Sequence, residues 1–248
     1  MTVLVEACVD AIDSALEARN GGAKRIELCG ELLQGGVTPS AGLIGAVWER
    51  VDVPVFVLIR PRPGDFLYTD DELDVMIRDI ELADSIDADG IVLGALTRDG
   101  DVDVGTMSKL IDAAGSMQVT FHRAFDFARD QHVALEALIE LGVDRVLTSG
   151  GAPTALEGAP QIGRLREQAG NRIAILAGGS ITAENVSEIV RVSGVQEVHV
   201  RAAARVESAM VHRREAVSLA RPHFLGDYDR QMTRASEMVA LVDAIANA

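Results

Sequence analysis

One stretch decides the fold: LGVDRVLTSG, residues 141–150. Its second residue, Gly142, is placed to end a helix; the strand candidate Arg145–Thr148 follows, and a second glycine, Gly150, comes soon after that strand. Similar helix exits stand at residues 21–25 and 194–197, where a glycine is again followed at once by a strand candidate. A helix-to-strand transition repeated in this way predicts successive right-handed βαβ units and a parallel sheet.

Short apolar runs of this kind recur along the whole chain. The strand candidates are Val3–Cys8, Arg25–Cys29, Val55–Arg60, Gly90–Leu93, Gln118–His122, Arg145–Thr148, Arg172–Ala177 and Glu197–Val200. Helix candidates between them include Ala11–Arg19, Ser40–Arg50, Asp70–Ile86, Val104–Ala114 and Asp130–Leu141. Eight strand–helix units in 248 residues predict one α/β domain, a (β/α)8 TIM barrel over residues 1–248.

Two further features concern the rest of the architecture. No Gly-x-Gly-x-x-Gly motif follows the first strand, which argues against a doubly wound dinucleotide-binding fold. Residues 202–230 are less periodic, and we expect a small extra helix there. Residues 231–248 are expected to form the final amphipathic helix.

Composition excludes several classes of function. The formal net charge of −15 argues against nonspecific nucleic-acid binding, which needs clustered Lys and Arg. No apolar stretch reaches the roughly 18 residues that a membrane span requires. The first residues lack a basic segment and carry Glu6 where a signal peptide would be apolar. We therefore expect a soluble cytoplasmic protein whose two cysteines are free thiols.

The first two strand candidates end in the same pattern, a glutamate two residues before a cysteine. Side chains alternate along a strand, so Glu6 and Cys8 share one face, as do Glu27 and Cys29. If that face is the barrel interior, two thiols on neighbouring strands lie close enough to share a soft ion such as Cu(I). The alternative is that both cysteines are ordinary core residues.

The third and fifth strand candidates end in basic residues. Arg60 stands in a proline-rich loop suited to gripping a carboxylate or phosphate, or else forms a structural salt bridge to Glu27 or Glu6. His122 and Arg123 end the fifth strand. His122 is a candidate general acid or base, with a hydrogen-bonded core histidine as the alternative.

Glycines follow the seventh strand candidate. Gly178 and Gly179, followed by Ser180, lead towards a helix for which Thr182 is the expected N-cap. In TIM barrels, backbone N–H groups directly after the seventh strand often surround a phosphate. His199 lies at the end of the neighbouring eighth strand candidate. These residues are candidate cofactor- or anion-binding groups; the alternative is a tight turn.

Taken together, the strand ends resemble those of the CutC family, which is named for copper homeostasis. The matching phrases are EACVD (6–10), RIELC (25–29), GGVTPS (35–40), IRPR (59–62) with GDF (64–66), FHRAFD (121–126) and LTSG (147–150). The similarity extends to about residue 200. The chain departs from the family at Ser180, where a third glycine is common, and at residues 200–203, where the family has small residues and Arg201 could instead contribute charge.

The resemblance implies a cytoplasmic TIM barrel that handles copper, with Cys8 and Cys29 as Cu(I) ligands. The alternative is an uncharacterised isomerase, aldolase or lyase that acts on a small anionic metabolite and needs no organic cofactor. In that hypothesis Glu27 or His122 moves protons, Arg60 and Arg123 hold the anion, and Glu6 completes the site. A third hypothesis is a barrel that serves as a binding scaffold or homo-oligomer.

Overall fold

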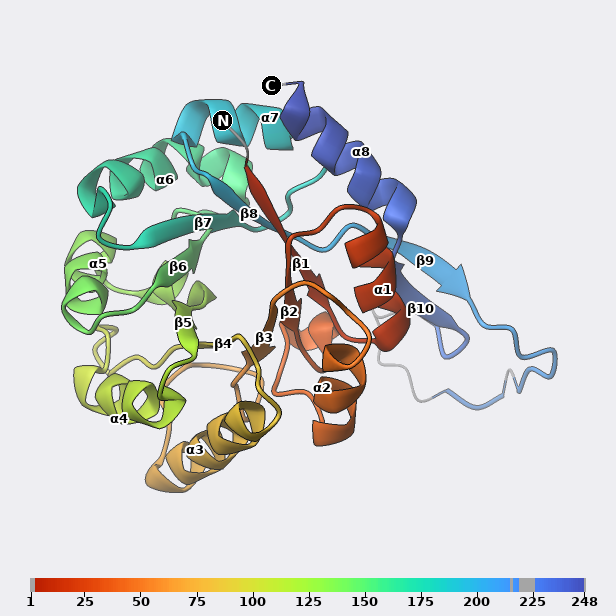
Figure 1. Cartoon of the computed structure of the whole chain (residues 1–248), viewed down its shortest axis with the longest axis horizontal. Coiled ribbons are helices and arrows are strands. Elements are labelled where there is room, and N and C mark those ends of the chain that lie inside the picture. The colour runs from red at the N-terminus through yellow and green to blue at the C-terminus, as the bar shows by residue number, and fades with distance from the viewer. Residues whose placement is uncertain (1–2, 215, 219–225, 248) are drawn as a thin grey trace.

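The computed structural model describes residues 3–214, 216–218 and 226–247, and its centre is a closed parallel barrel (Figure 1). Its strands, which pair in chain order, are β1 (Leu4–Val9), β2 (Arg25–Leu28), β3 (Val55–Leu58), β4 (Gly90–Leu93), β5 (Gln118–Phe121), β6 (Arg145–Thr148), β7 (Ala174–Gly178) and β8 (Glu197–Val200). Strand β8 pairs with β1 and closes the ring, with Glu6 opposite His199. The predicted (β/α)8 barrel is therefore confirmed.

Helices surround the barrel on its outside (Figure 1). They are α1 (Ile12–Asn20), α2 (Ala41–Trp48), α3 (Asp70–Ser85), α4 (Val104–Ala114), α5 (Gln131–Glu140), α6 (Ala155–Ala169), α7 (Val186–Ser193) and α8 (Ala235–Ala246). Short 3-10 turns at Leu32–Gln34 and Arg123–Phe127 follow β2 and β5. Side-chain caps fix where helices begin; the capping residues are Ser40, Thr69, Asp103, Asp130 and Thr154. Among the described residues, no helix is both long and apolar enough to cross a bilayer.

Alternation along the strands separates two apolar regions. Outward-facing side chains such as Val5 and Ala7 join the large core between strands and helices. Inward-facing side chains form a smaller cluster inside the barrel, made of Cys8, Cys29, Phe56, Leu58 and Val92. The interior face is thus the one that also carries the glutamates, which settles the condition that the sequence pattern had left open.

The C-terminal third differs from its prediction. The expected small helix within residues 202–230 is wrong where the chain is described, because β9 (Ala203–Glu207) pairs antiparallel with β10 (Asp229–Thr233). This hairpin projects from the barrel beside α1 and α8 (Figure 1). The final helix begins at Ala235, since the preceding residues belong to β10; residue 248 lies outside the described residues. Cross-strand pairing of Arg205 with Asp229, at 2.6 Å, supports the hairpin.

The helix after β7 also begins later than expected. Thr182 is not its N-cap: α7 starts at Val186, after a turn in which the Thr182 N–H donates to Asn185 Oδ1 at 2.9 Å. The Asn185 side chain in turn donates to the carbonyl of Ser180. This internal pairing holds the loop in a turn and delays the helix by several residues.

Candidate functional site

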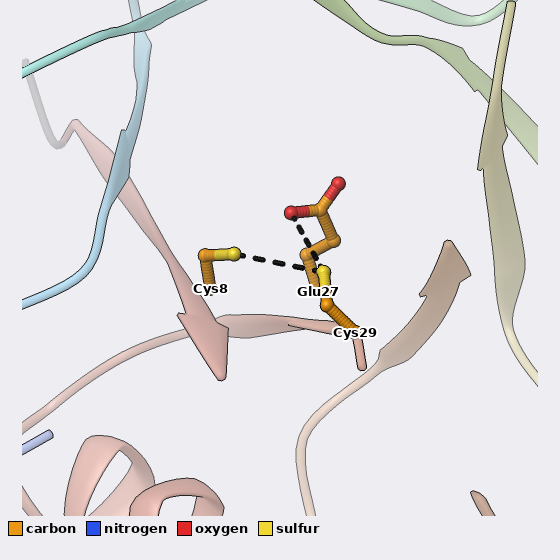
Figure 2. A group of neighbouring side chains, drawn as sticks. All are labelled: Cys8, Glu27 and Cys29. Carbon is orange, nitrogen blue, oxygen red and sulfur yellow. Dashed lines mark hydrogen bonds between the residues drawn. The ribbon is translucent and has the colours of Figure 1, made fainter. Parts of the chain in front are cut away.

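The two cysteines meet at the carboxyl-terminal end of the barrel. Cys8 lies near the end of β1 and Cys29 follows β2, and their Sγ atoms are 3.7 Å apart. Both thiols are free and buried. Glu27 points to the same spot from β2, and Cys29 Sγ donates to Glu27 Oε2 at 3.5 Å (Figure 2). One ligand atom from each of the three residues lies within 4.8 Å of the others, which is a spacing that one metal ion can bridge.

His199 joins this group from the neighbouring strand β8. Its Nδ1 lies 2.7 Å from Glu6 Oε1, and its Nε2 lies 3.6 Å from Glu27 Oε2. Burial alone would lower the pKa of His199, but the charge of Glu27 and the hydrogen bonds with Cys8 and Glu6 raise it well above the usual value. The sequence had placed His199 with the glycines after β7; the structure pairs it with Gly178 and also puts it beside Glu27 and the cysteines.

The pKa values of the two thiols are shifted in opposite directions. The pKa of Cys8 falls to about 5, mainly because Cys8 hydrogen-bonds with Cys29. Burial acts in the opposite direction, and His199 helps to lower the pKa. Burial, followed by the hydrogen bond and charge of Cys8, raises the pKa of Cys29 well above its usual value. Burial and the charge of Cys8 likewise raise the pKa of Glu27. The arrangement therefore holds one thiolate, Cys8, next to a protonated imidazole.

Beneath the cysteines, Glu6 belongs to a buried ion-pair network. The Arg25 Nε–H donates to Glu6, and the other side of the Arg25 guanidinium lies 2.5 Å from Glu197. Arg145 pairs with the same Glu197 at 2.6 Å. Burial would raise the pKa of Glu6, but hydrogen bonding and charge from His199 and Arg25 lower it to about 2. Glu6 thus stays ionised and orients His199.

The sequence interpretation missed this network. Arg25 opens β2 two residues before Glu27, so alternation already placed its side chain inside the barrel. Glu197 opens β8 by the same rule. Closure of the ring brings these two strand starts together on either side of β1.

Arg60 lies on another wall of the mouth and is 6% exposed. The salt bridge to Glu27 or Glu6 considered for it is wrong: its guanidinium donates to the carbonyls of Gly36 at 2.8 Å and Gly64 at 2.9 Å. Among the described residues Arg60 forms no salt bridge, and its buried Nε has no partner. Instead, Arg25 neutralises Glu6.

His122 follows β5 and is 5% exposed. Its Nδ1 accepts from the Ala124 N–H at 3.2 Å, while its Nε2 is buried without a partner in the described structure. Burial and then the nearby charge of Arg60 lower the pKa of His122 to about 3. Its ring packs 4.9 Å from the ring of Phe66. His122 is therefore neutral at physiological pH.

Arg123, next to His122, is fixed by Asp126. Its Nε–H donates to Asp126 at 2.7 Å and another of its N–H groups donates to Ser149 Oγ at 2.8 Å. Asp126 also accepts from the backbone of Ser149 and Gly151. These bonds tie the ends of β5 and β6 together, so Arg123 stays in place beside the mouth although its side chain is partly exposed.

The residues after β7 make room for their neighbours. A Cβ on Gly178 would lie 2.5 Å from Leu147 Cδ1 and 3.2 Å from His199 Cβ, so the glycine admits both side chains. Gly179 has a positive φ of 118° and lies under Arg123. Ser180 also has a positive φ, 55°. The N–H of Thr182 is already bonded within the loop.

A cavity of about 120 Å3 opens at this mouth. Its wall includes both cysteines, Glu27, His199, Arg60, His122 and Arg123. Apolar side chains also line it; they are Leu32, Leu58, Phe66 and Leu147. The structure therefore gathers most of the residues singled out in the sequence around one small cavity, with Glu6 just below it.

Comparison with known proteins gives consistent results. The family model described as CutC family matches residues 3–204. The human copper homeostasis protein cutC homolog is 46% identical over 243 residues, covering 98% of this chain and 89% of that protein. A family protein CutC from Chromobacterium violaceum is 44% identical over 248 residues and is covered completely.

Solved structures agree with the sequence comparison. The structure of CutC from Streptococcus agalactiae has a TM-score of 0.77 at 35% identity, covering 80% of this chain and 98% of that one. Phosphoribosylanthranilate isomerase from Thermotoga maritima has a TM-score of 0.60 at 12% identity, with both chains fully covered. At that identity the second likeness concerns the fold alone.

Proposed function

The chain belongs to the CutC family, and from this premise we propose that it serves copper homeostasis by binding Cu(I) between Cys8 and Cys29. The observation that carries the proposal is the 3.7 Å separation of the two Sγ atoms. This distance is shorter than two metal–sulfur bonds of about 2.3 Å laid end to end, so one ion can contact both sulfurs. Thiolates are the ligands that Cu(I) prefers.

The surroundings of the sulfurs support the same proposal. Cys8 is held as a thiolate, so only the Cys29 proton must leave when the ion binds. Glu27 stands close enough to accept that proton or to approach the ion as a third ligand. The apolar cluster around the sulfurs keeps competing water away from the ion. Because the pair must stay reduced to bind, we place this function in the cytoplasm.

The test is an anaerobic titration of the reduced protein with Cu(I) against a chromogenic competing chelator. We expect one ion per chain in the wild type and loss of that ion in the Cys8→Ser, Cys29→Ser double variant. Val92→Ala is the matched control, because it perturbs the same interior cluster without removing a sulfur. A double variant that holds Cu(I) as tightly as the wild type would refute the proposal.

A further inference from the structure

The wall of the mouth that contains Arg60 carries a charge that the protein does not neutralise. The Arg60 guanidinium is buried, its hydrogen bonds go to backbone carbonyls, and among the described residues it has no carboxylate partner. A buried cation without a counterion is costly, and this one occurs in a chain whose net charge is −15. Its Nε–H is also left without an acceptor. An anion bound near Arg60 would relieve both costs.

His122, which lines the same cavity as Arg60, offers a second unused donor. Since Nδ1 accepts a backbone N–H, the proton of the neutral ring must be on Nε2. That Nε2–H is buried and has no acceptor within the described structure. A neutral imidazole that keeps a buried N–H unsatisfied is expensive unless a ligand oxygen completes it.

The position of the His122 ring is fixed by its neighbours Gly94 and Phe66. A Cβ on Gly94 would lie 2.7 Å from both Nδ1 and Cε1 of His122, so the ring sits where only a glycine leaves room. Phe66 packs against the ring and also lies under the Arg60 guanidinium, 5.1 Å from the Arg60 Cζ. Phe66 therefore packs against both donor residues, and all three residues line the cavity.

We propose that the barrel mouth binds a small carboxylate, with its oxygens accepting from His122 Nε2–H and the Arg60 guanidinium and its apolar body against Leu58 and Leu147. The cavity, at about 120 Å3, is well below the roughly 300 Å3 of drug-sized pockets, so the ligand is a metabolite of a few carbons. Arg123, at the rim, attracts the ligand, although its own charge is already paired with Asp126.

A carboxylate fits this wall better than a phosphate. Phosphate sites in TIM barrels use backbone N–H groups after β7 and a helix N-terminus. Here the N–H of Thr182 is bonded to Asn185 and α7 begins only at Val186, so neither that N–H nor the start of a helix directly after β7 is available to a phosphate. Two side-chain donors on a largely apolar cavity match the two oxygens of one carboxylate. This inference goes beyond the copper proposal and does not depend on it.

The test uses metal-free reduced protein with four probes: butyrate, pyruvate, inorganic phosphate and butyramide. Binding is followed by calorimetry and by the 15N-edited resonance of the His122 Nε2–H. We expect butyrate or pyruvate to bind saturably and to move that resonance downfield, because the N–H gains a charged acceptor. Butyramide has the shape of butyrate without its charge and should bind more weakly.

Variants of His122 distinguish the effect of its Nε2–H donor from the effect of its ring packing. His122→Phe should weaken carboxylate binding by about ten- to a hundredfold, the effect of one hydrogen bond to a charged group. His122→Gln, whose amide can donate in place of Nε2–H, should recover most of the loss. His132→Gln, on the exposed surface of α5, is the control and should bind as the wild type does.

Four results would overturn the inference: no saturable carboxylate binding, an unmoved His122 resonance, equal affinity for butyramide and butyrate, or tighter binding of phosphate. The resonance is read in the wild type, so the test stands even if a variant folds poorly. The Cys8→Ser, Cys29→Ser variant should keep carboxylate binding. Its behaviour separates a failure of this site from a failure of the copper site.

Discussion

Lowering the pH from 7 to 5 should destabilise the protein through His122. The pKa of this histidine is lowered from 6.5 to about 3, first by burial and then by the charge of Arg60. As the pH falls, the unfolded chain takes up the proton near pH 6.5, whereas the folded chain does not until about pH 3. The contribution of His122 to the free energy of unfolding is therefore fully present above pH 7, and it is lost progressively as the pH falls to the pKa of the folded state. At pH 5 the linkage relation gives a loss of about 2 kcal/mol.

The assay compares urea unfolding at pH 7 and pH 5 for the wild type and His122→Gln. Glutamine does not titrate, so the variant should lose about 2 kcal/mol less than the wild type between the two pH values. Equal pH dependence in the wild type and His122→Gln, or a His122 ring resonance that titrates near pH 6.5, would refute the reasoning.

Further predictions concern the barrel interior and its glycines. Arg25→Met should reduce the free energy of unfolding by about 3–5 kcal/mol in urea denaturation, because it leaves Glu6 without its buried cation. Gly158→Ala should lower the thermal midpoint markedly, since the new Cβ would lie 1.8 Å from the Ser149 carbonyl oxygen. Gly45→Ala in α2 meets no atom within 4 Å and should instead stabilise the protein by about 0.5–1 kcal/mol in the same measurement.

The barrel could be predicted because its signals are local. Strands such as Gly90–Leu93 and Glu197–Val200 have the predicted bounds, since each is a short segment that comes soon after a helix-ending glycine or an Asp-Ala-Asp turn. The hairpin of β9 and β10 could not be found in this way. Its strands are polar on one side and lie more than twenty residues apart in the chain, so their pairing is a non-local event.

The site could be predicted only in part, for a related reason. Alternation alone placed Glu6 with Cys8 and Glu27 with Cys29 on one face of each strand, and the structure shows that this face is the barrel interior. The place of His199 depends on the closure of β8 against β1, which a residue-by-residue reading of strand ends does not use. A closed eight-stranded ring implies that neighbour relation, so the signal was present in the predicted fold itself. The partners of Arg60 could not be predicted, because they are carbonyls of loops whose path the sequence does not specify.

One cavity thus combines two kinds of chemistry that favour different ligands. The sulfurs of Cys8 and Cys29 suit a soft monovalent ion, whereas the donors of Arg60 and His122 suit a hard oxyanion. Leucine and phenylalanine side chains line the same cavity. The cavity is small enough for a bound carboxylate to cover the sulfurs. Carboxylate binding should therefore slow the exchange of Cu(I) with an external chelator without removing the ligands of the ion.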